Sequence, residues 1–158
     1  MTSTVDALDA SLIALMTAEP RIGVLECSRR LGVARGTVQA RLDRLVTRAV
    51  IRGFGPDVDP AALGYRVTAF ATLEIAQGRG DEVVAHLAEL PEVIEAHTIT
   101  GPGDLLCRVV ARDNADLQRV IDRMVEVVGI RRTSSVIALS TRIASRVLPL
   151  VERAAGGE

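Results

Sequence analysis

The sequence has no lysine and no tryptophan, and only three aromatic residues, two cysteines and two histidines among 158 residues. With so few aromatics, the core must be built from Leu, Val, Ile and Ala. The hydrophobic fraction of 48% predicts a folded chain and excludes a disordered one. All nineteen basic residues are arginine, a bias to which we give no functional meaning.

Segments typical of export or of membrane insertion are also missing. The sequence does not open with a basic stretch followed by an apolar one, so no signal peptide is predicted. No apolar run approaches the roughly 20 residues of a spanning helix. Cys27 and Cys107 lie far apart on apolar positions, which predicts reduced core residues and neither a disulfide nor a metal site. We expect a cytoplasmic protein with no membrane partner.

Catalytic patterns are scarce as well. The only histidines are His86 and His97, and the sequence shows no nucleophile motif, metal-ligand cluster or phosphate loop. The sequence therefore predicts no enzyme, no catalytic residue and no cofactor.

Two short helices joined by a tight turn are predicted within residues 23–45. The turn is centred on Gly32. The apolar positions of the second helix recur at i, i+4 and i+7, one stripe that must face a core: Val38, Leu42 and Leu45. In the first helix Leu25 and Leu31 are expected to point inward, with small Ser28 at a close crossing. This pattern predicts a helix-turn-helix, in which the second helix is the recognition helix.

Charge favours this interpretation over an ordinary helical hairpin, which would show the same glycine turn and apolar period. Residues 21–55 hold eight arginines against Glu26 and Asp43, a local net charge of +6 in a chain of net charge −1. Arginines suit phosphates, and an amide and a hydroxyl suit base edges. The residues predicted to contact double-stranded DNA are Arg29, Arg30, Arg35, Gly36, Thr37, Gln39, Ala40, Arg41, Arg44, Arg48 and Arg52.

Two further elements are expected to complete this domain, residues 1–54. A helix from Thr4 or Asp6 to Thr17 supplies the third wall, and Asp9 lies early in it, where the helix dipole favours an anion. Its buried side is expected to hold Leu8, Leu12, Ile13, Leu15 and Met16. After the recognition helix, Val50, Ile51 and Phe54 predict a short strand, a winged-helix-like feature. Residues 55–66, with two prolines and two aspartates, form a stiff linker.

Residues 67–140 contain a near-repeat of strand, helix and strand. Strands are predicted at 67–75, 93–100, 104–111 and 130–139, with helices between residues 78 and 91 and between 113 and 129. The inward side of the second helix is expected to hold Leu117, Val120, Ile121, Met124 and Val128. The fold class is therefore α+β: a helix-turn-helix domain followed by a βαββαβ ferredoxin-like α/β sandwich.

One face of that sheet is predicted to stay free of helices, and an apolar free face favours a dimer. The tail, residues 141–158, carries an apolar patch at 147–151 that we expect to pack on a neighbouring subunit.

At this point the chain resembles the Lrp/AsnC (feast/famine) family of bacterial and archaeal transcriptional regulators, and the resemblance covers nearly the whole sequence. The matching pieces are Leu8-Asp9, Pro20-Arg21, Arg29-Arg30-Leu31-Gly32-Val33, Val38, Arg41, Leu42, Leu45, Ile51, Gly53-Phe54, Pro60 and the Gly101-x-Gly-Asp104 turn. The resemblance implies sequence-specific DNA binding, with an amino acid or related metabolite as effector. It also implies homodimers that assemble further, into octamers or open rings.

The chain departs from the family pattern at three places in the DNA-binding part. Ala34 stands where the family usually has a serine capping the recognition helix, a loss of about 1 kcal/mol. Arg35-Gly36-Thr37 replaces small residues and prolines, so base contacts cannot be copied across. Ala49 stands where the family favours glycine.

The effector site implied by the resemblance is the turn between the second and third strands. Its glycines expose N–H groups to a carboxylate, and Asp104 could accept from an ammonium group. The predicted effector residues are His97, Thr98, Thr100, Gly101, Pro102, Gly103, Asp104, Ser134 and Ser135. The alternative is that Gly-Pro-Gly-Asp is only a tight turn, with Asp104 as a local cap and His97 on a solvated strand. The Arg131-Arg132 pair is typical of a solvated edge.

Two other functions fit parts of this pattern. Some tetrapyrrole-pathway decarboxylases share the two-part architecture, so the fold alone does not settle the function. An architectural protein that wraps DNA with little sequence preference would need a similar basic surface.

Overall fold

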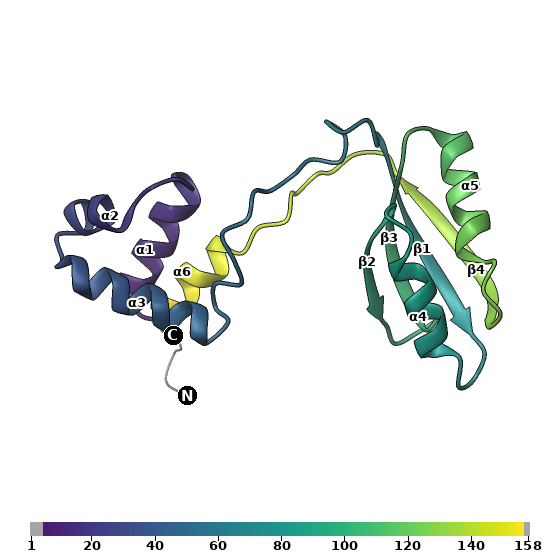
Figure 1. Cartoon of the computed structure of the whole chain (residues 1–158), viewed down its shortest axis with the longest axis horizontal. Coiled ribbons are helices and arrows are strands. Elements are labelled where there is room, and N and C mark those ends of the chain that lie inside the picture. Colours follow the sequence, from purple (N-terminus) through teal and green to yellow (C-terminus); the bar gives the residue numbers. More distant parts are fainter. Residues whose placement is uncertain (1–4, 157–158) are drawn as a thin grey trace. The chain divides into compact units, whose positions relative to one another are not determined.

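The chain folds into two compact units. The structure is a computed structural model and describes residues 5–156. The residues up to Pro56, together with those from Ile143 onward, form what we call the helical unit, and Asp57–Arg142 form the sheet unit. Figure 1 shows α1, α2, α3 and α6 in the first and the four strands with α4 and α5 in the second. Within the described residues, no helix is long and apolar enough to cross a membrane.

Helix α1 (Ala7–Ala18) begins with a reciprocal cap. The side chain of Asp6 accepts from the Asp9 N–H (2.9 Å), and the side chain of Asp9 accepts from the Asp6 N–H (3.2 Å). The helix therefore starts after Asp6, and the other predicted start, Thr4, lies outside the described residues. Leu12 is buried as predicted, and the remaining predicted apolar positions are partly buried: Leu8, Ile13, Leu15 and Met16.

Helices α2 (Val24–Leu31) and α3 (Arg35–Thr47) form the predicted pair. Gly32 caps α2 with φ +65°, a left-handed conformation that glycine adopts without strain. The stripe of Val38, Leu42 and Leu45 is buried. Leu25 was predicted to point inward and does not: it is 51% exposed, because Cys27 and Ser28 occupy the buried side of α2.

The short strand predicted after α3 does not form: residues 48–56, all of them described, contain neither strand nor helix. The reason is the end of α3, where the N–H groups of Val50 and Ile51 both donate to the carbonyl of Leu45 (2.9 and 3.1 Å). Backbone groups that close a helix are not free to pair with a strand.

The apolar patch of the tail forms helix α6 (Leu148–Gly156). We expected it on a neighbouring subunit. In the structure Val151 and Ala155 instead pack in the helical unit of the same chain, against Val5, Ala10 and Leu45. The driving force is the same in both arrangements, burial of an apolar helix face.

The sheet unit has the predicted βαββαβ order. Its strands are β1 (Val67–Ile75), β2 (Val93–Thr98), β3 (Leu105–Ala111) and β4 (Ile130–Ala138). Helix α4 (Gly80–Ala88) follows β1, and α5 (Asn114–Met124), capped by the Asp113 carboxylate, follows β3. All neighbouring strands are antiparallel in the order β2-β3-β1-β4, which is the ferredoxin-like arrangement.

One core fills the space between the sheet and its two helices. Alternate residues of the central strands point into it, together with Val83 and Leu87 of α4 and Leu117, Val120 and Met124 of α5. Val128, predicted inward, is 68% exposed because α5 has ended before it.

Within the sheet unit, all of whose residues are described, both helices pack on the same face of the sheet, and the opposite face carries none (Figure 1). Phe70 of β1 and Val136 of β4 are paired in register on it and are exposed.

Candidate functional site

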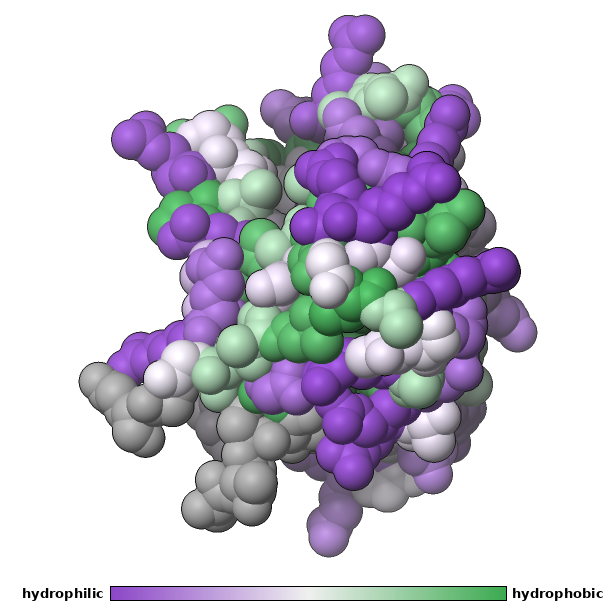
Figure 2. All heavy atoms as spheres, turned by 90° about the vertical axis from the view of Figure 1, so that its left-hand side faces the viewer, coloured by the Kyte–Doolittle hydropathy of each residue, from purple (hydrophilic) through white to green (hydrophobic). Residues whose placement is uncertain are grey.

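The exposed face of α3 surrounds a shallow hollow. Five of the residues predicted to contact DNA line it, alternately one and three positions apart along α3: Gly36, Thr37, Ala40, Arg41 and Arg44. We call this the α3 hollow. Its floor is made of small side chains, so a ligand backbone can come close to the helix. Figure 2 looks onto the side of the molecule drawn on the left of Figure 1, where hydrophilic side chains project around apolar patches.

Two arginines of the α3 hollow are bound within the chain. Arg41 contacts Asp9 (Nη1 to Oδ1, 2.8 Å) and Asp6, and Arg44 contacts Asp9 (Nη2 to Oδ2, 2.6 Å). The Asp9 carboxylate is only 1% exposed, so it depends on these guanidinium groups for its compensation. The four residues join α1 to the recognition helix across more than thirty positions of sequence.

The same contacts shift two pKa values. The hydrogen bond from Arg41 holds the pKa of Asp6 below its ordinary range, and Asp6 in turn raises the pKa of Arg41. Both groups therefore stay ionised at neutral pH.

The other residues predicted to contact DNA differ in whether their side chains are paired with other residues of the chain. Arg30 is paired with Glu19 (2.8 Å), and Arg29 lies 3.6 Å from Glu26. The Gln39 amide donates to Asp43 one turn later. Within the described residues, three of the predicted cations are exposed and make no ion pair: Arg35, Arg48 and Arg52. These guanidinium groups are the most available to phosphates.

Both ends of α3 show the expected departures from the family pattern. Ala34 occupies the N-cap position, where no side chain accepts from the first-turn N–H groups. Ala49 has φ +55°, a left-handed conformation that costs a residue with a Cβ atom and suits glycine.

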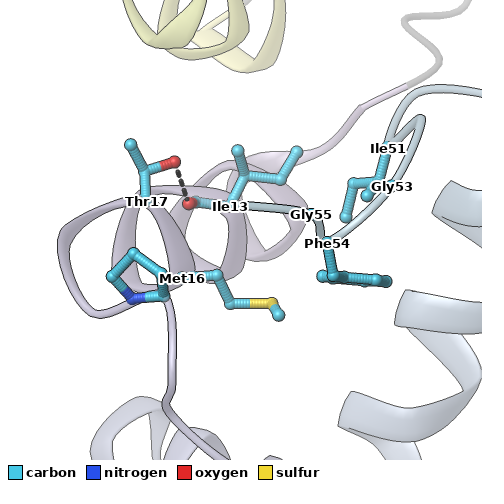
Figure 3. A pocket seen from close by; sticks show the side chains of 8 residues that line it. Ile13, Met16, Thr17, Ile51, Gly53, Phe54 and Gly55 are labelled. Atoms are coloured by element: carbon cyan, nitrogen blue, oxygen red, sulfur yellow. Dashed lines mark hydrogen bonds between the residues drawn. The ribbon is translucent and has the colours of Figure 1, made fainter. Parts of the chain in front are cut away.

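A second hollow, of about 210 Å³, lies beside the segment that follows α3. Figure 3 shows Ile13 and Met16 of α1 on one side and Ile51 and Phe54 of that segment on the other. The Thr17 hydroxyl is turned to the carbonyl of Ile13, to which it donates (2.8 Å). Phe54 remains 63% exposed at its edge.

In the sheet unit, the predicted effector turn is tied to β1. The Ile75 N–H donates to the Asp104 carboxylate (Oδ2, 2.6 Å), and the Asp104 N–H donates to the Leu73 carbonyl (2.8 Å). Asp104 thus acts as a local cap, as in the alternative interpretation, and uses its Oδ2 atom to do so. Gly101 has φ +117°, and a Cβ on Gly103 would lie 2.4 Å from Thr72 Cγ2, so both positions require glycine.

Asp104 stands between two hollows. One, of about 370 Å³, is lined by the turn itself with Glu74, Ile75 and Arg131. The other, of about 310 Å³, is lined by Thr98, Asp104 and Leu105, by Gly78 of the segment between β1 and α4, and by three residues of α4 itself, Gly80, Asp81 and Val84. We call the second the loop hollow.

A repeated motif in the sequence marks the loop hollow, although the predicted effector residues include only its second copy. Gly78-Arg79-Gly80-Asp81 repeats the Gly-x-Gly-Asp pattern of Gly101-Pro102-Gly103-Asp104. The fold brings both segments to the same end of the sheet, so their aspartates face one cavity. Helix α4 begins there, and its N-cap residue Arg79 provides no side-chain cap. First-turn N–H groups therefore remain for a ligand.

The remaining predicted effector residues lie elsewhere. His97 is exposed on β2, 3.5 Å from Glu95, and lines neither hollow. Ser134 and Ser135 lie opposite Thr72 and Ala71 in the sheet, and Thr100 is exposed before the turn; none of them lines either hollow. Gly101, Pro102, Gly103, Asp104 and Thr98 are the predicted residues that the fold does bring to a cavity.

Neither cysteine belongs to a site. Cys27 and Cys107 are buried and free, and burial raises the pKa of the Cys107 thiol to about 11. Among residues 5–156, no group of three or more metal-ligating side chains comes together.

Family models match both parts of the chain. The AsnC-type helix-turn-helix domain matches residues 5–46, and the Lrp/AsnC ligand binding domain matches residues 68–148. An HTH-type transcriptional regulator of Pyrococcus abyssi is 34% identical over 87% of this chain and 87% of its own length.

Solved structures agree with this match. AsnC of E. coli has a TM-score of 0.84 at 27% identity, covering 92% of this chain and 99% of its own. A feast or famine regulatory protein of M. tuberculosis, complexed with L-methionine, has a TM-score of 0.78 at 26% identity, covering 89% of this chain and 96% of its own. The chain belongs to the Lrp/AsnC family and is a DNA-binding transcriptional regulator with a ligand-binding domain.

Proposed function

We propose that this regulator reads its operator with the exposed face of α3, and that an amino acid or related small metabolite in the loop hollow changes operator affinity or oligomeric state. The proposed effector site rests on one observation: the two Gly-x-Gly-Asp segments contribute their aspartates, Asp81 and Asp104, to the same cavity. The L-methionine complex of the M. tuberculosis relative supports an amino acid as the class of ligand.

The loop hollow offers a partner to each part of an amino acid. The carboxylates of Asp81 and Asp104 suit the ammonium group, and the uncapped first turn of α4 suits the carboxylate. Val84 and Leu105 form an apolar wall for a side chain.

For DNA, the exposed guanidinium groups of Arg35, Arg48 and Arg52 would bind phosphates, while Thr37 and Gln39 face the bases. Two recognition helices of a dimer would enter successive major grooves, with half-sites about one helical turn apart. We place the dimer contact on the open sheet face at Phe70 and Val136, with further assembly into octamers or open rings. A regulator of this kind would work in the cytoplasm, where the DNA is.

The first experiment is a gel-shift titration on the promoter DNA that flanks the protein's own gene, repeated with each amino acid. We expect specific retardation that one amino acid alters. Equal binding of promoter and random duplex would favour the architectural alternative, and binding without any amino acid response would contradict the effector half.

Two variants test which residues bind DNA and which residues bind the effector. Arg35→Ala should weaken promoter binding several-fold and lower by about 1 the slope of log affinity against log salt concentration. Arg119→Ala, at an exposed position of α5, should bind the promoter like wild type. Asp81→Asn should weaken the amino acid response and leave effector-free DNA binding unchanged, with Asp122→Asn as its control. A wild-type response in Asp81→Asn would move the pocket elsewhere.

A further inference from the structure

Helix α6 completes the core of the helical unit, although residues 149–158 lie beyond the residues matched by either family model. Val151 and Ala155, one turn apart, pack against a cluster whose buried members are Val5, Ala10 and Leu45. Figure 1 shows α6 among the helices of this unit.

Leu45 of the recognition helix and two residues of α6, Val151 and Ala155, belong to one hydrophobic cluster. Leu45 is the third member of the buried α3 stripe and is completely buried, and the cluster that buries it includes Val151 of α6. The other two members, Val38 and Leu42, belong to a separate cluster with Leu12 and Cys27. Helix α3 therefore shares one cluster with α1 and α2 and another, through Leu45, with α1 and α6.

The chain reaches α6 through the sheet unit. Strand β4 begins beside the hollow of about 370 Å³, where Arg131 lines the wall with Gly101–Asp104. This hollow shares Ile75 and Asp104 with the loop hollow. After Ala138 comes a segment without helix or strand, residues 139–147, and then α6. One continuous stretch of chain thus runs from the hollow next to the proposed ligand site to the helical unit in which the recognition helix packs.

We propose that α6 is a positioning helix for the recognition helix, and that the segment 139–147 is the second connection through which the sheet unit controls it. A domain joined by one linker reorients freely, whereas a domain held through two segments transmits a change at β4 to its own core. The positioning role stands on packing alone. The control role rests on the proposed effector function.

The positioning role is tested in the full chain by hydrogen exchange of Val151→Asp. The matched control is Leu150→Asp, the neighbouring residue on α6, which is 63% exposed and outside the cluster. Val151→Asp should speed exchange in α1 and α3 at least about tenfold and leave β1–β4 at wild-type rates. Val151→Ala should give the same pattern in smaller measure. Unchanged exchange in α1 and α3 in both Val151 variants, or equal effects in the control, would overturn the positioning role.

The control role is tested by inserting six Gly-Ser residues between Ser140 and Thr141, which slackens the connection and leaves α6 its packing partners. Exchange in α1 and α3 should stay at wild-type rates, and promoter DNA should bind as before in fluorescence anisotropy. The shift in affinity caused by the amino acid active on wild type should disappear. A full shift in this variant would overturn the control role. If wild type responds to no amino acid, the proposed effector function fails and the control role fails with it, while the exchange comparison still decides the positioning role.

Discussion

The sheet unit has one continuous core made only of apolar side chains, between a four-stranded sheet and two helices. The helical unit has two smaller clusters and, between α1 and α3, a carboxylate that is almost fully buried with two arginines on it. Apolar burial is non-directional, whereas an ion pair fixes both distance and direction. The sheet unit therefore owes its stability mainly to burial, and the helical unit also depends on charge for the placement of its recognition helix.

Removing the buried charge should give the largest effect, and only in the helical unit. Asp9→Asn removes the buried charge between the two guanidinium groups, leaving Arg44 without its close partner and Arg41 with Asp6 alone, so the helical unit should lose about 2–3 kcal/mol of unfolding free energy. The measurement is denaturant unfolding combined with hydrogen exchange of α1 and α3. Asp43→Asn, an exposed carboxylate that accepts from Gln39, is the control. Equal losses in the two variants would mean that the contact to Asp9 is not special.

A comparable break in the sheet unit needs a steric change. The Cβ of Gly103→Ala would lie 2.4 Å from Thr72 Cγ2 and 3.2 Å from the Leu73 carbonyl oxygen. Overpacking of this kind costs about 2 kcal/mol, so the melting temperature of the sheet unit should fall. Gly80→Ala has open space around its Cβ and should melt like wild type. A normal melting temperature for Gly103→Ala would show that β1 yields easily at Thr72.

The helical unit can be strengthened at the start of α3. Ala34→Ser would provide the missing cap, because its hydroxyl can accept a first-turn N–H, and should add about 1 kcal/mol to the unfolding free energy. Ala40→Ser makes the same exchange in mid-helix, where no cap is possible, and should be neutral or slightly destabilising. If the two variants have the same unfolding free energy in chemical denaturation, the missing cap at Ala34 does not lower the stability of α3.

The smallest expected effect is a pH dependence of the stability of the helical unit. The pKa of Asp6 is lower in the folded chain than in the unfolded one, mainly through the hydrogen bond from Arg41. The ionised Asp6 carboxylate therefore adds to the unfolding free energy above about pH 4, and this addition is lost as the pH falls further. Because the side chain is about half exposed, the loss should stay under about 1 kcal/mol. Asp6→Asn, whose side chain can still cap α1, should reduce the fall of the unfolding free energy at acid pH. An unchanged fall would mean that other carboxylates cause it.

Local patterns predicted most of the fold. The apolar stripe of α3, the glycine turn before it and the bounds of β1 follow from periodicities of 3.6 and 2, which depend only on neighbouring residues. The departures Ala34 and Ala49 were also readable, because each acts at its own position: Ala34 lacks a capping side chain, and Ala49 has a Cβ atom where the backbone is left-handed.

What the sequence did not predict depends on contacts between distant segments. Asp9 lies three and four residues before Leu12 and Ile13, on the apolar side of α1, and this spacing hinted at its burial; its arginine partners lie more than thirty residues away. Likewise Asp81 and Asp104 belong to separate repeats, and only the sheet order brings their segments to one cavity. The absent strand after α3 was lost to helix-closing hydrogen bonds that no apolar pattern records.

The position of α6 in the sequence also sets an order for folding during synthesis. Every residue of the sheet unit, Asp57–Arg142, is made before α6. Segments leave the ribosome in the order of their synthesis, so Leu45 lacks part of its packing until Val151, which follows the whole sheet unit, has emerged. The recognition helix of a nascent chain would thus be among the last elements to be firmly held.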